Sequence, residues 1–186
     1  MYELGCGLCD AVKEGSRIVY ETDHAIGLLN LNPINPTHLL VLPRRHVQEF
    51  IDLRENEAFG YLILREQMEA RIHTLFPSNE HQRLSPGSFH NANYAQTQEH
   101  VHEQVLAHCS HARHSYDQSH EVSPDEELGI KRIGEWKSSR THPLVEASVL
   151  DKIVEHIRGT GNLERDRAAL NEANEYILRQ RGVLLS

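Results

Sequence analysis

The stretch LLNLNPINPTHLLVLPRRHV, residues 28–47, decides the fold of this chain. It continues a β-prone run, AIGLLNL, at residues 25–31. Two Asn-Pro steps follow, and each favours extended or turn geometry because a proline restricts the residue before it. A second β-prone run at residues 38–42 stops before Pro43. The stretch therefore predicts a strand, a loop and a second strand.

Further strands are predicted on both sides of this stretch. The run RIVYE at residues 17–21 precedes residues 25–31 across a short polar turn, which predicts a β-hairpin. Residues 87–91 predict a fourth strand, and residues 100–106 predict a fifth.

One long helix is predicted between these strands. Apolar residues recur at roughly helical spacing over residues 53–75, within a charged background that suits a helix covering one face of a sheet. A polar loop is expected to follow as far as Ser85-Pro86-Gly87. Together these elements predict an α+β domain over residues 1–107.

The remainder of the chain divides into a polar segment and a helical extension. Residues 108–127 are rich in His, Ser, Asp and Glu, so they lack the apolar surface needed to order themselves, and we expect a loop or linker. Residues 128–186 contain two helix candidates, at residues 144–157 and 163–178. The C-terminal extension is therefore predicted to be mainly helical.

Composition narrows the functional classes. The chain has 186 residues, of which 39% are hydrophobic, and no apolar run approaches the roughly 20 residues of a membrane span. The N-terminal residues do not resemble a secretory signal, so a cytoplasmic protein is expected. A net charge of −8 argues against binding the phosphate backbone of a nucleic acid, which requires a basic face. A small anionic ligand remains possible.

The stretch QEHVHEQVL, residues 98–106, places polar side chains at alternate positions. In a strand, His100, His102 and Gln104 share one face, which suits a metal site, a phosphate site or a nucleophilic histidine. The chain contains 14 histidines, however, and an isolated His-x-His pair in such a chain is more typical of a hydrophilic edge strand. The pair alone does not decide between these interpretations.

The cysteines offer a second candidate site. Cys6 and Cys9 form a Cys-x-x-Cys pair, which is typical of half a metal site or of a redox pair, and a reduced pair without metal is the plainer alternative. Ligand-type residues also occur in or beside the polar segment, where a solvated loop is the favoured interpretation: His108, Cys109, His111 and His114.

Together these motifs resemble the histidine-triad (HIT) superfamily of nucleotidyl hydrolases and transferases. The resemblance rests on CGLC at residues 6–9, the stretch at residues 28–47, the helix, and AQTQEHVHEQVL at residues 95–106, all in the order that the family has. It implies an antiparallel sheet of about five strands with one long helix. It also implies a homodimer and a nucleotide-derived small-molecule substrate.

The resemblance implies roles for individual residues. His102 matches the nucleophile that forms a transient nucleotidyl-histidine, held by a hydrogen bond from its other ring nitrogen. Asn30 matches the residue that binds the ribose, with Ile26 and Leu28 beside a base pocket. His38 matches a structural histidine near the site. Phosphate contacts are implied for a polar group before the triad: Asn91 or Asn93, Gln96 and Thr97.

Some members of the family also pair an N-terminal Cys-x-x-Cys with two later histidines. The corresponding set is Cys6, Cys9, His46 and His100, which implies a closed, structural zinc site of the Cys₂His₂ type. Such a site would fasten the N-terminal segment to the strand carrying His102. A zinc-dependent hydrolase is the alternative if only three of the four residues bind the metal.

Gln104 stands where most HIT hydrolases have a third histidine, and the His-x-His-x-Gln form resembles the transferase branches. A glutamine amide can donate a hydrogen bond to phosphate, but it cannot deliver a proton to a leaving group. The chain departs from those transferases in its shorter length and in having Glu103 within the motif. The expected function is nucleotidyl hydrolysis or transfer through His102, with Gln104 assisting. A nucleotide-binding or scaffolding protein without turnover is the alternative.

Overall fold

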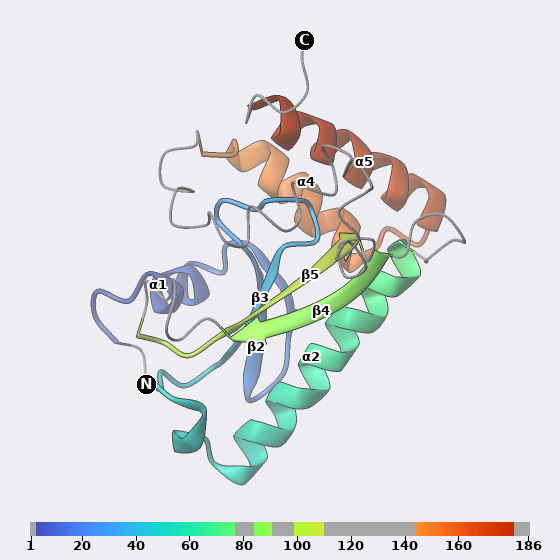
Figure 1. The fold of residues 1–186 in the computed structure, drawn as a ribbon. Coiled ribbons are helices and arrows are strands. Elements are labelled where there is room, and N and C mark those ends of the chain that lie inside the picture. Colours follow the sequence, from blue (N-terminus) through green and yellow to red (C-terminus); the bar gives the residue numbers. More distant parts are fainter. Residues whose placement is uncertain (1–2, 77–83, 91–98, 110–143, 181–186) are drawn as a thin grey trace, which may run out of the picture.

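A five-stranded antiparallel sheet forms the centre of the molecule (Figure 1). The computed structural model describes residues 3–76, 84–90, 99–109 and 144–180. The strand order is β1-β2-β3-β5-β4. The strands are β1 (Ile18–Glu21), β2 (Ala25–Leu29), β3 (Leu39–Pro43), β4 (Leu84–His90) and β5 (Glu103–Cys109). The predicted α+β fold and its antiparallel sheet are confirmed.

The β1–β2 hairpin forms as predicted, because a single threonine holds its turn. The hydroxyl of Thr22 accepts hydrogen bonds from the backbone N–H groups of His24, at 3.3 Å, and Ala25, at 2.9 Å. Such a side-chain bond is the typical reason for threonine in a tight turn. The central strands β2 and β3 are buried at every position, which explains their continuous apolar sequence.

Two strand boundaries were predicted incorrectly. β4 begins at Leu84, so Ser85-Pro86-Gly87 is part of a strand and not of a loop; β4 lies at the edge of the sheet, where a proline is tolerated. β5 begins at Glu103, so the predicted strand from residue 100 starts too early. The reason is local, because the N–H of Val101 donates to the carbonyl of Val47, at 2.8 Å, away from the sheet.

Two helices flank the sheet on opposite sides. The long helix α2 (Glu55–Leu75) confirms the prediction for residues 53–75. The short helix α1 (Gly7–Glu14) was not predicted. Its N-cap is Cys6, whose sulfur accepts from the N–H of Cys9, and its C-cap is Gly15, which adopts the left-handed conformation with φ of 66°. A 3₁₀ turn, Phe50–Asp52, precedes α2.

The sheet separates two clusters of buried side chains. On one face, Leu39, Val41 and Val105 pack with α2 and with the C-terminal helices α4 (Ala147–Arg158) and α5 (Leu163–Gln180). On the other face, Leu40 and Leu42 pack against α1. Figure 1 shows α4 and α5 side by side at one end of the sheet, with α2 crossing it. The candidate site described below lies on the α1 face.

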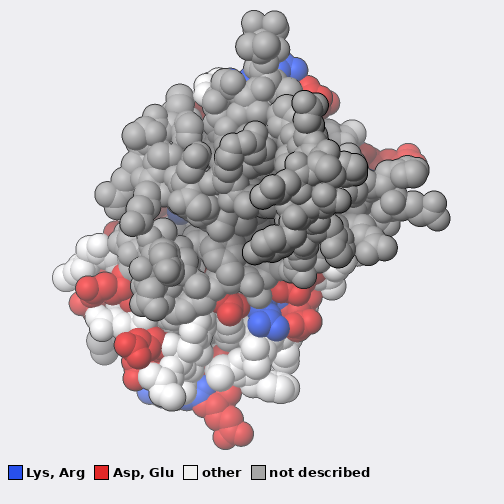
Figure 2. All heavy atoms as spheres, in the orientation of Figure 1, with Lys and Arg blue, Asp and Glu red and all other residues white. Residues whose placement is uncertain are grey.

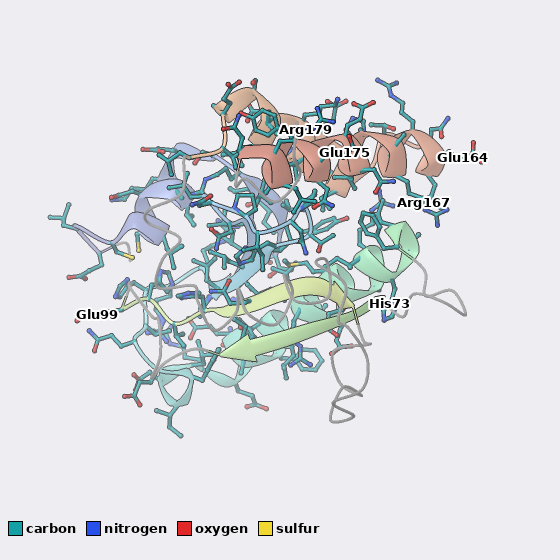
Figure 3. The ribbon with its side chains drawn as sticks, turned by 45° about the horizontal axis from the view of Figure 1, so that its top comes forward. His73, Glu99, Glu164, Arg167, Glu175 and Arg179 are labelled. Atoms are coloured by element: carbon teal, nitrogen blue, oxygen red, sulfur yellow. The ribbon has the colours of Figure 1, made fainter. Side chains whose placement is uncertain are left out.

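The C-terminal helices are joined to α2 by a buried ionic network. Asp166 is only 1% exposed and accepts from Arg71 of α2 at 3.0 Å and from His156 of α4 at 2.9 Å. Arg167 reaches from α5 toward the end of α2 (Figure 3), where it donates to the carbonyls of Thr74 and Leu75. These helices therefore share the core of the sheet domain.

The predicted division of the chain at residues 107 and 127 stays a prediction. β5 extends to Cys109, past the predicted boundary at residue 107, and residues 110–143 lie outside the described residues. None of the helices in the described ranges combines the length and the hydropathy that a transmembrane span requires. Figure 2 shows acidic side chains spread over the described part of one face, with few basic ones beside them, consistent with the net charge of −8.

Candidate functional site

Four metal-type ligands meet between α1 and the segments flanking the sheet. The ligand atoms of Cys6, Cys9, His46 and His100 all lie within 4.8 Å of one another. Cys9 Sγ is 3.4 Å from Nδ1 of His46 and 3.5 Å from Nδ1 of His100, and Cys6 Sγ is 3.9 Å from the latter. Ligand atoms around a tetrahedral zinc ion stand roughly 3.3–3.8 Å apart. The four residues therefore fit a zinc ion.

The second ring nitrogen of His100 fixes the ring for metal binding. Its Nε2–H donates to the carbonyl of Pro43 at 2.9 Å, which leaves the lone pair of Nδ1 directed at the cysteines. Burial lowers the pKa of His100 to about 4, so the ring is neutral at pH 7 and able to act as a ligand. Burial also raises the pKa of the Cys9 thiol, an effect that a bound cation would oppose.

The segment carrying His46 is held by an ion pair to α2. Arg45 donates two hydrogen bonds to Glu57, at 2.8 and 2.6 Å. Glu57 also accepts from the N–H of Arg54 at the start of α2. The hydrogen bonds from Arg45 lower the pKa of Glu57 to about 2, so the pair remains charged in ordinary buffers. This contact positions His46 from the long helix.

His102 is held in the orientation that a nucleophilic histidine requires. The residue is 6% exposed, and its Nδ1 lies 2.8 Å from the backbone carbonyl of His100. A carbonyl can only accept, so Nδ1 carries a proton, and in the neutral ring Nε2 carries the lone pair. The expected hydrogen bond from the second ring nitrogen is thus present. The partner, His100, is at the same time a candidate metal ligand.

Gln104 and His38 meet on the same face of the sheet. Gln104 lies opposite Leu40 in the pairing of β5 with β3. Its Oε1 is 2.8 Å from Nε2 of His38, and both side chains are buried. The Nδ1 of His38 accepts from the N–H of Ile34 at 3.2 Å, and the amide nitrogen of Asn30 is 3.1 Å from Nε2. Asn30, His38 and Gln104 thus form one cluster.

The structure corrects one prediction about this segment. His100 and His102 precede β5, so these histidines do not share a strand face with Gln104. His100 turns to the cysteines, and the ring of His102 bonds back to the carbonyl of His100. These two bonds, and not strand alternation, orient His100 and His102, whereas Gln104 bonds to His38. Because β5 begins only at Glu103, Gln104 is the one residue of His100, His102 and Gln104 that lies within the strand.

Other predicted residues have different outcomes. Ile26 and Leu28 are fully buried in the cluster beneath α1, and their place beside a base pocket stays a prediction. Asn30 is half-buried at the end of β2. The predicted phosphate contacts all lie outside the described residues: Asn91, Asn93, Gln96 and Thr97. Of the weaker ligand candidates, His108 and Cys109 belong to β5, whereas His111 and His114 also lie outside the described residues.

Three contacts of the site were not predicted from the sequence. They are the bond from His100 to the carbonyl of Pro43, the ion pair of Arg45 with Glu57, and the contact between His38 and Gln104. The first two involve residues beside His46, so a search near that ligand would have found candidates. The third joins residues 66 positions apart and depends on the β3–β5 register.

Comparison with known proteins identifies the domain family that the chain matches. The profile of the HIT domain matches residues 12–111. A HIT-like protein of Methanocaldococcus jannaschii is 32% identical over 47 residues, which cover 25% of this chain and 36% of that protein. The chain thus spans little more than a third of that relative.

Solved structures share the fold. A HIT-like protein of Bartonella henselae aligns with a TM-score of 0.56 and 16% identity, covering 91% of this chain and 98% of that one. A HIT family protein of Bacillus anthracis aligns with a TM-score of 0.50 and 19% identity, covering 74% and 96%. Identities this low establish the fold alone. Because the HIT domain profile covers more than half of the sequence, we conclude that this chain belongs to the HIT family.

Proposed function

We propose that this protein is a nucleotidyl hydrolase or transferase that acts through a covalent intermediate on His102. The observation that carries the proposal is the 2.8 Å bond from Nδ1 of His102 to the carbonyl of His100, which places the lone pair of the neutral ring on Nε2. In the first step Nε2 attacks the α-phosphorus of a nucleotide derivative, and the leaving group departs with the electron pair of its bond. In the second step water or another acceptor displaces the histidine.

The side chain of Gln104 limits the leaving groups. Its amide is able to stabilise charge on the phosphate oxygens, but it is too weak an acid to deliver a proton to the leaving group. The leaving oxygen must therefore be stable as an anion, as it is in a phosphate or pyrophosphate. Nucleotides joined through a phosphoanhydride are the substrate class that fits this site best.

Zinc is proposed as a structural cofactor, because four protein ligands would close the coordination shell and leave no position for a water nucleophile. The ion would lock His100, and the carbonyl of His100 orients His102. Zinc would thus act on the reaction by fixing the nucleophile. The alternative, an open zinc site, would require one of the four ligands to be released.

A homodimer is proposed through the exposed face of α2. Three large apolar side chains are exposed there: Phe59 is 66% exposed, Leu62 48% and Ile63 41%. Apolar side chains gathered on one helix face are typical of an interface. A second copy of this chain is the partner that we propose.

The proposed reaction is tested by measuring release of nucleoside monophosphate from a panel of adenylyl and uridylyl donors. His102→Ala should abolish release while leaving nucleotide binding nearly unchanged, since His102 acts on the bond and not on the base. His73→Ala, on the exposed side of α2, is the matched control and should keep full activity. Residual activity in His102→Ala above roughly 1% would argue against the covalent role. Tight binding without turnover in the wild-type protein would favour a nucleotide-binding protein.

A further inference from the structure

We propose that His38 is a positioning residue that fixes the direction of the Gln104 amide, so that its NH₂ group faces the nucleotide phosphate. The identity of the ligand rests on the proposed function above. The direction of the amide rests only on hydrogen bonds within this chain. His38 is fully buried and Gln104 is 3% exposed, so water does not compete for these groups.

The direction of the chain of hydrogen bonds is set by the backbone. The N–H of Ile34 points at Nδ1 of His38 at 3.2 Å, and a backbone N–H can only donate. The Nδ1 atom must therefore accept, which places the ring proton on Nε2. That N–H then donates to the nearest acceptor, Oε1 of Gln104, at 2.8 Å.

A second amide lies near the same ring nitrogen, and it does not compete as an acceptor. The nitrogen Nδ2 of Asn30 is 3.1 Å from Nε2 of His38. The oxygen of that amide is already held by the N–H of Asn32 at 2.9 Å. Asn30 therefore cannot turn its oxygen toward His38 without losing a bond to the backbone. Gln104 is the acceptor of the His38 proton.

The loop that supplies the fixed donor is itself held in place. The side-chain oxygen of Asn35 accepts from both the N–H and the hydroxyl of Thr37, at 2.9 and 2.8 Å. The N–H of His38 donates to the carbonyl of Asn35 at 3.1 Å. These bonds, together with two prolines in the loop, keep the N–H of Ile34 directed at the histidine ring.

The fixed direction of the Gln104 amide determines which end of it faces a bound anion. A glutamine amide free to rotate would present its oxygen to the phosphate in part of the molecules, and the two groups would repel each other. With Oε1 held by His38, the NH₂ end is the one available to donate to a phosphate oxygen. Such a donor is preorganised before the ligand arrives. His38 therefore acts on the substrate through Gln104 and is not a catalytic residue.

The first test needs neither ligand nor turnover. Long-range ¹H–¹⁵N correlation spectra of the wild-type protein report which ring nitrogen of each histidine carries the proton, and His38→Gln assigns the His38 signals by their loss. We expect the neutral form of His38 with the proton on Nε2. A proton on Nδ1, or on both nitrogens at pH 7, would overturn the proposal. This readout stands even if the protein has no nucleotidyl activity.

The second test measures the preference for a phosphate. Binding constants for a nucleoside and its monophosphate give a ratio for each variant, with adenosine and uridine pairs as probes. His38→Phe should lower the preference for the monophosphate about tenfold, the effect of losing one hydrogen bond to a charged group. His38→Gln should stay within about threefold of wild type, because its amide can accept from Ile34 and donate to Gln104.

A double variant separates positioning from general destabilisation. In a Gln104→Leu background, His38→Phe should have no further effect on the phosphate preference, because the group that it positions is gone. An equal loss in both backgrounds would contradict the proposal, and so would a wild-type ratio in His38→Phe. If His38→Phe fails to fold, the rescue variant His38→Gln and the wild-type spectra still decide the question. Failure of the wild type to bind any nucleotide would refute the proposed function separately.

Discussion

The buried carboxylate of Asp166 is predicted to stabilise the folded protein. The isosteric change Asp166→Asn keeps the volume of the side chain and removes its charge. In the wild type this carboxylate accepts hydrogen bonds from Arg71 at 3.0 Å, from His156 at 2.9 Å and from the hydroxyl of Thr160 at 2.8 Å. The variant leaves the Arg71 guanidinium without its counter-charge between three helices. We therefore expect α4 and α5 to be held less firmly against α2.

The size of the expected stability loss in Asp166→Asn follows from the pKa of Asp166 and from the burial of its carboxylate. Burial alone would raise the pKa of Asp166, but the hydrogen bonds from His156, Thr160 and Arg71 together lower it from 3.8 to about 2. A shift of this size corresponds to about 2.5 kcal/mol of stability at pH 7. Removing one partner of a buried ion pair costs about 3–5 kcal/mol, and the partial exposure of Arg71 reduces that figure. We expect a loss of about 2–4 kcal/mol.

Thermal and urea unfolding measure this loss. For a chain of this length, the expected change lowers the melting temperature by about 4–16 °C. Glu172→Gln is the matched control, because Glu172 forms an exposed ion pair with Lys152 on the same two helices and should leave the melting temperature within error.

The stability that Asp166 contributes depends on pH, and the direction of that dependence follows from its lowered pKa. The folded pKa is depressed, so the contribution of Asp166 is present above pH 3.8 and is lost as the pH falls toward 2. The stability difference between wild type and Asp166→Asn should therefore shrink between pH 4 and pH 2. A difference below about 1 kcal/mol at pH 7, or one that does not shrink in acid, would refute the reasoning.

Two further predictions concern the metal and the assembly. Purified protein should contain about one zinc ion per chain by elemental analysis. Cys9→Ser should lose the ion while Cys109→Ser retains it, and normal zinc in Cys9→Ser would refute the ligand assignment. Light scattering coupled to gel filtration should give the mass of two chains for the wild type and of one chain for Phe59→Glu, which places a charge in the proposed interface. Ile51→Glu, at an exposed site outside α2, should remain dimeric, and a monomeric wild type would contradict the proposal.

The elements predicted well are those with strong local patterns. β2 and β3 are continuous apolar runs bounded by a turn and by prolines, and they lie within two residues of their predicted bounds. α2 has the length and spacing of an amphipathic helix. α1 was missed because it is only eight residues long and its N-cap is a cysteine, a residue that ordinarily indicates a metal or redox site.

The metal-type ligands of the candidate site were predicted as a set, whereas the geometry of the segment carrying the histidines was predicted less well. The Cys₂His₂ set is brought together as expected, because its four residues came from a resemblance that covers several motifs. Strand alternation failed at His100 and His102, since the backbone there bonds to Val47 and to the ring of His102 in place of a neighbouring strand. The link between His38 and Gln104 depends on a long-range register that no local pattern encodes.

The central claim is that His102 carries the nucleotide during turnover. Rapid-quench mass analysis of the intact protein, mixed with adenylyl and uridylyl donors, tests it most directly. The wild type should gain the mass of one nucleotidyl group within the first turnover, and His102→Ala should gain none. Decay of the adduct in buffer alone would identify a hydrolase, and persistence until phosphate or a sugar phosphate is added would identify a transferase. No adduct with any donor that the wild type binds, or an equal adduct in His102→Ala, would contradict the account.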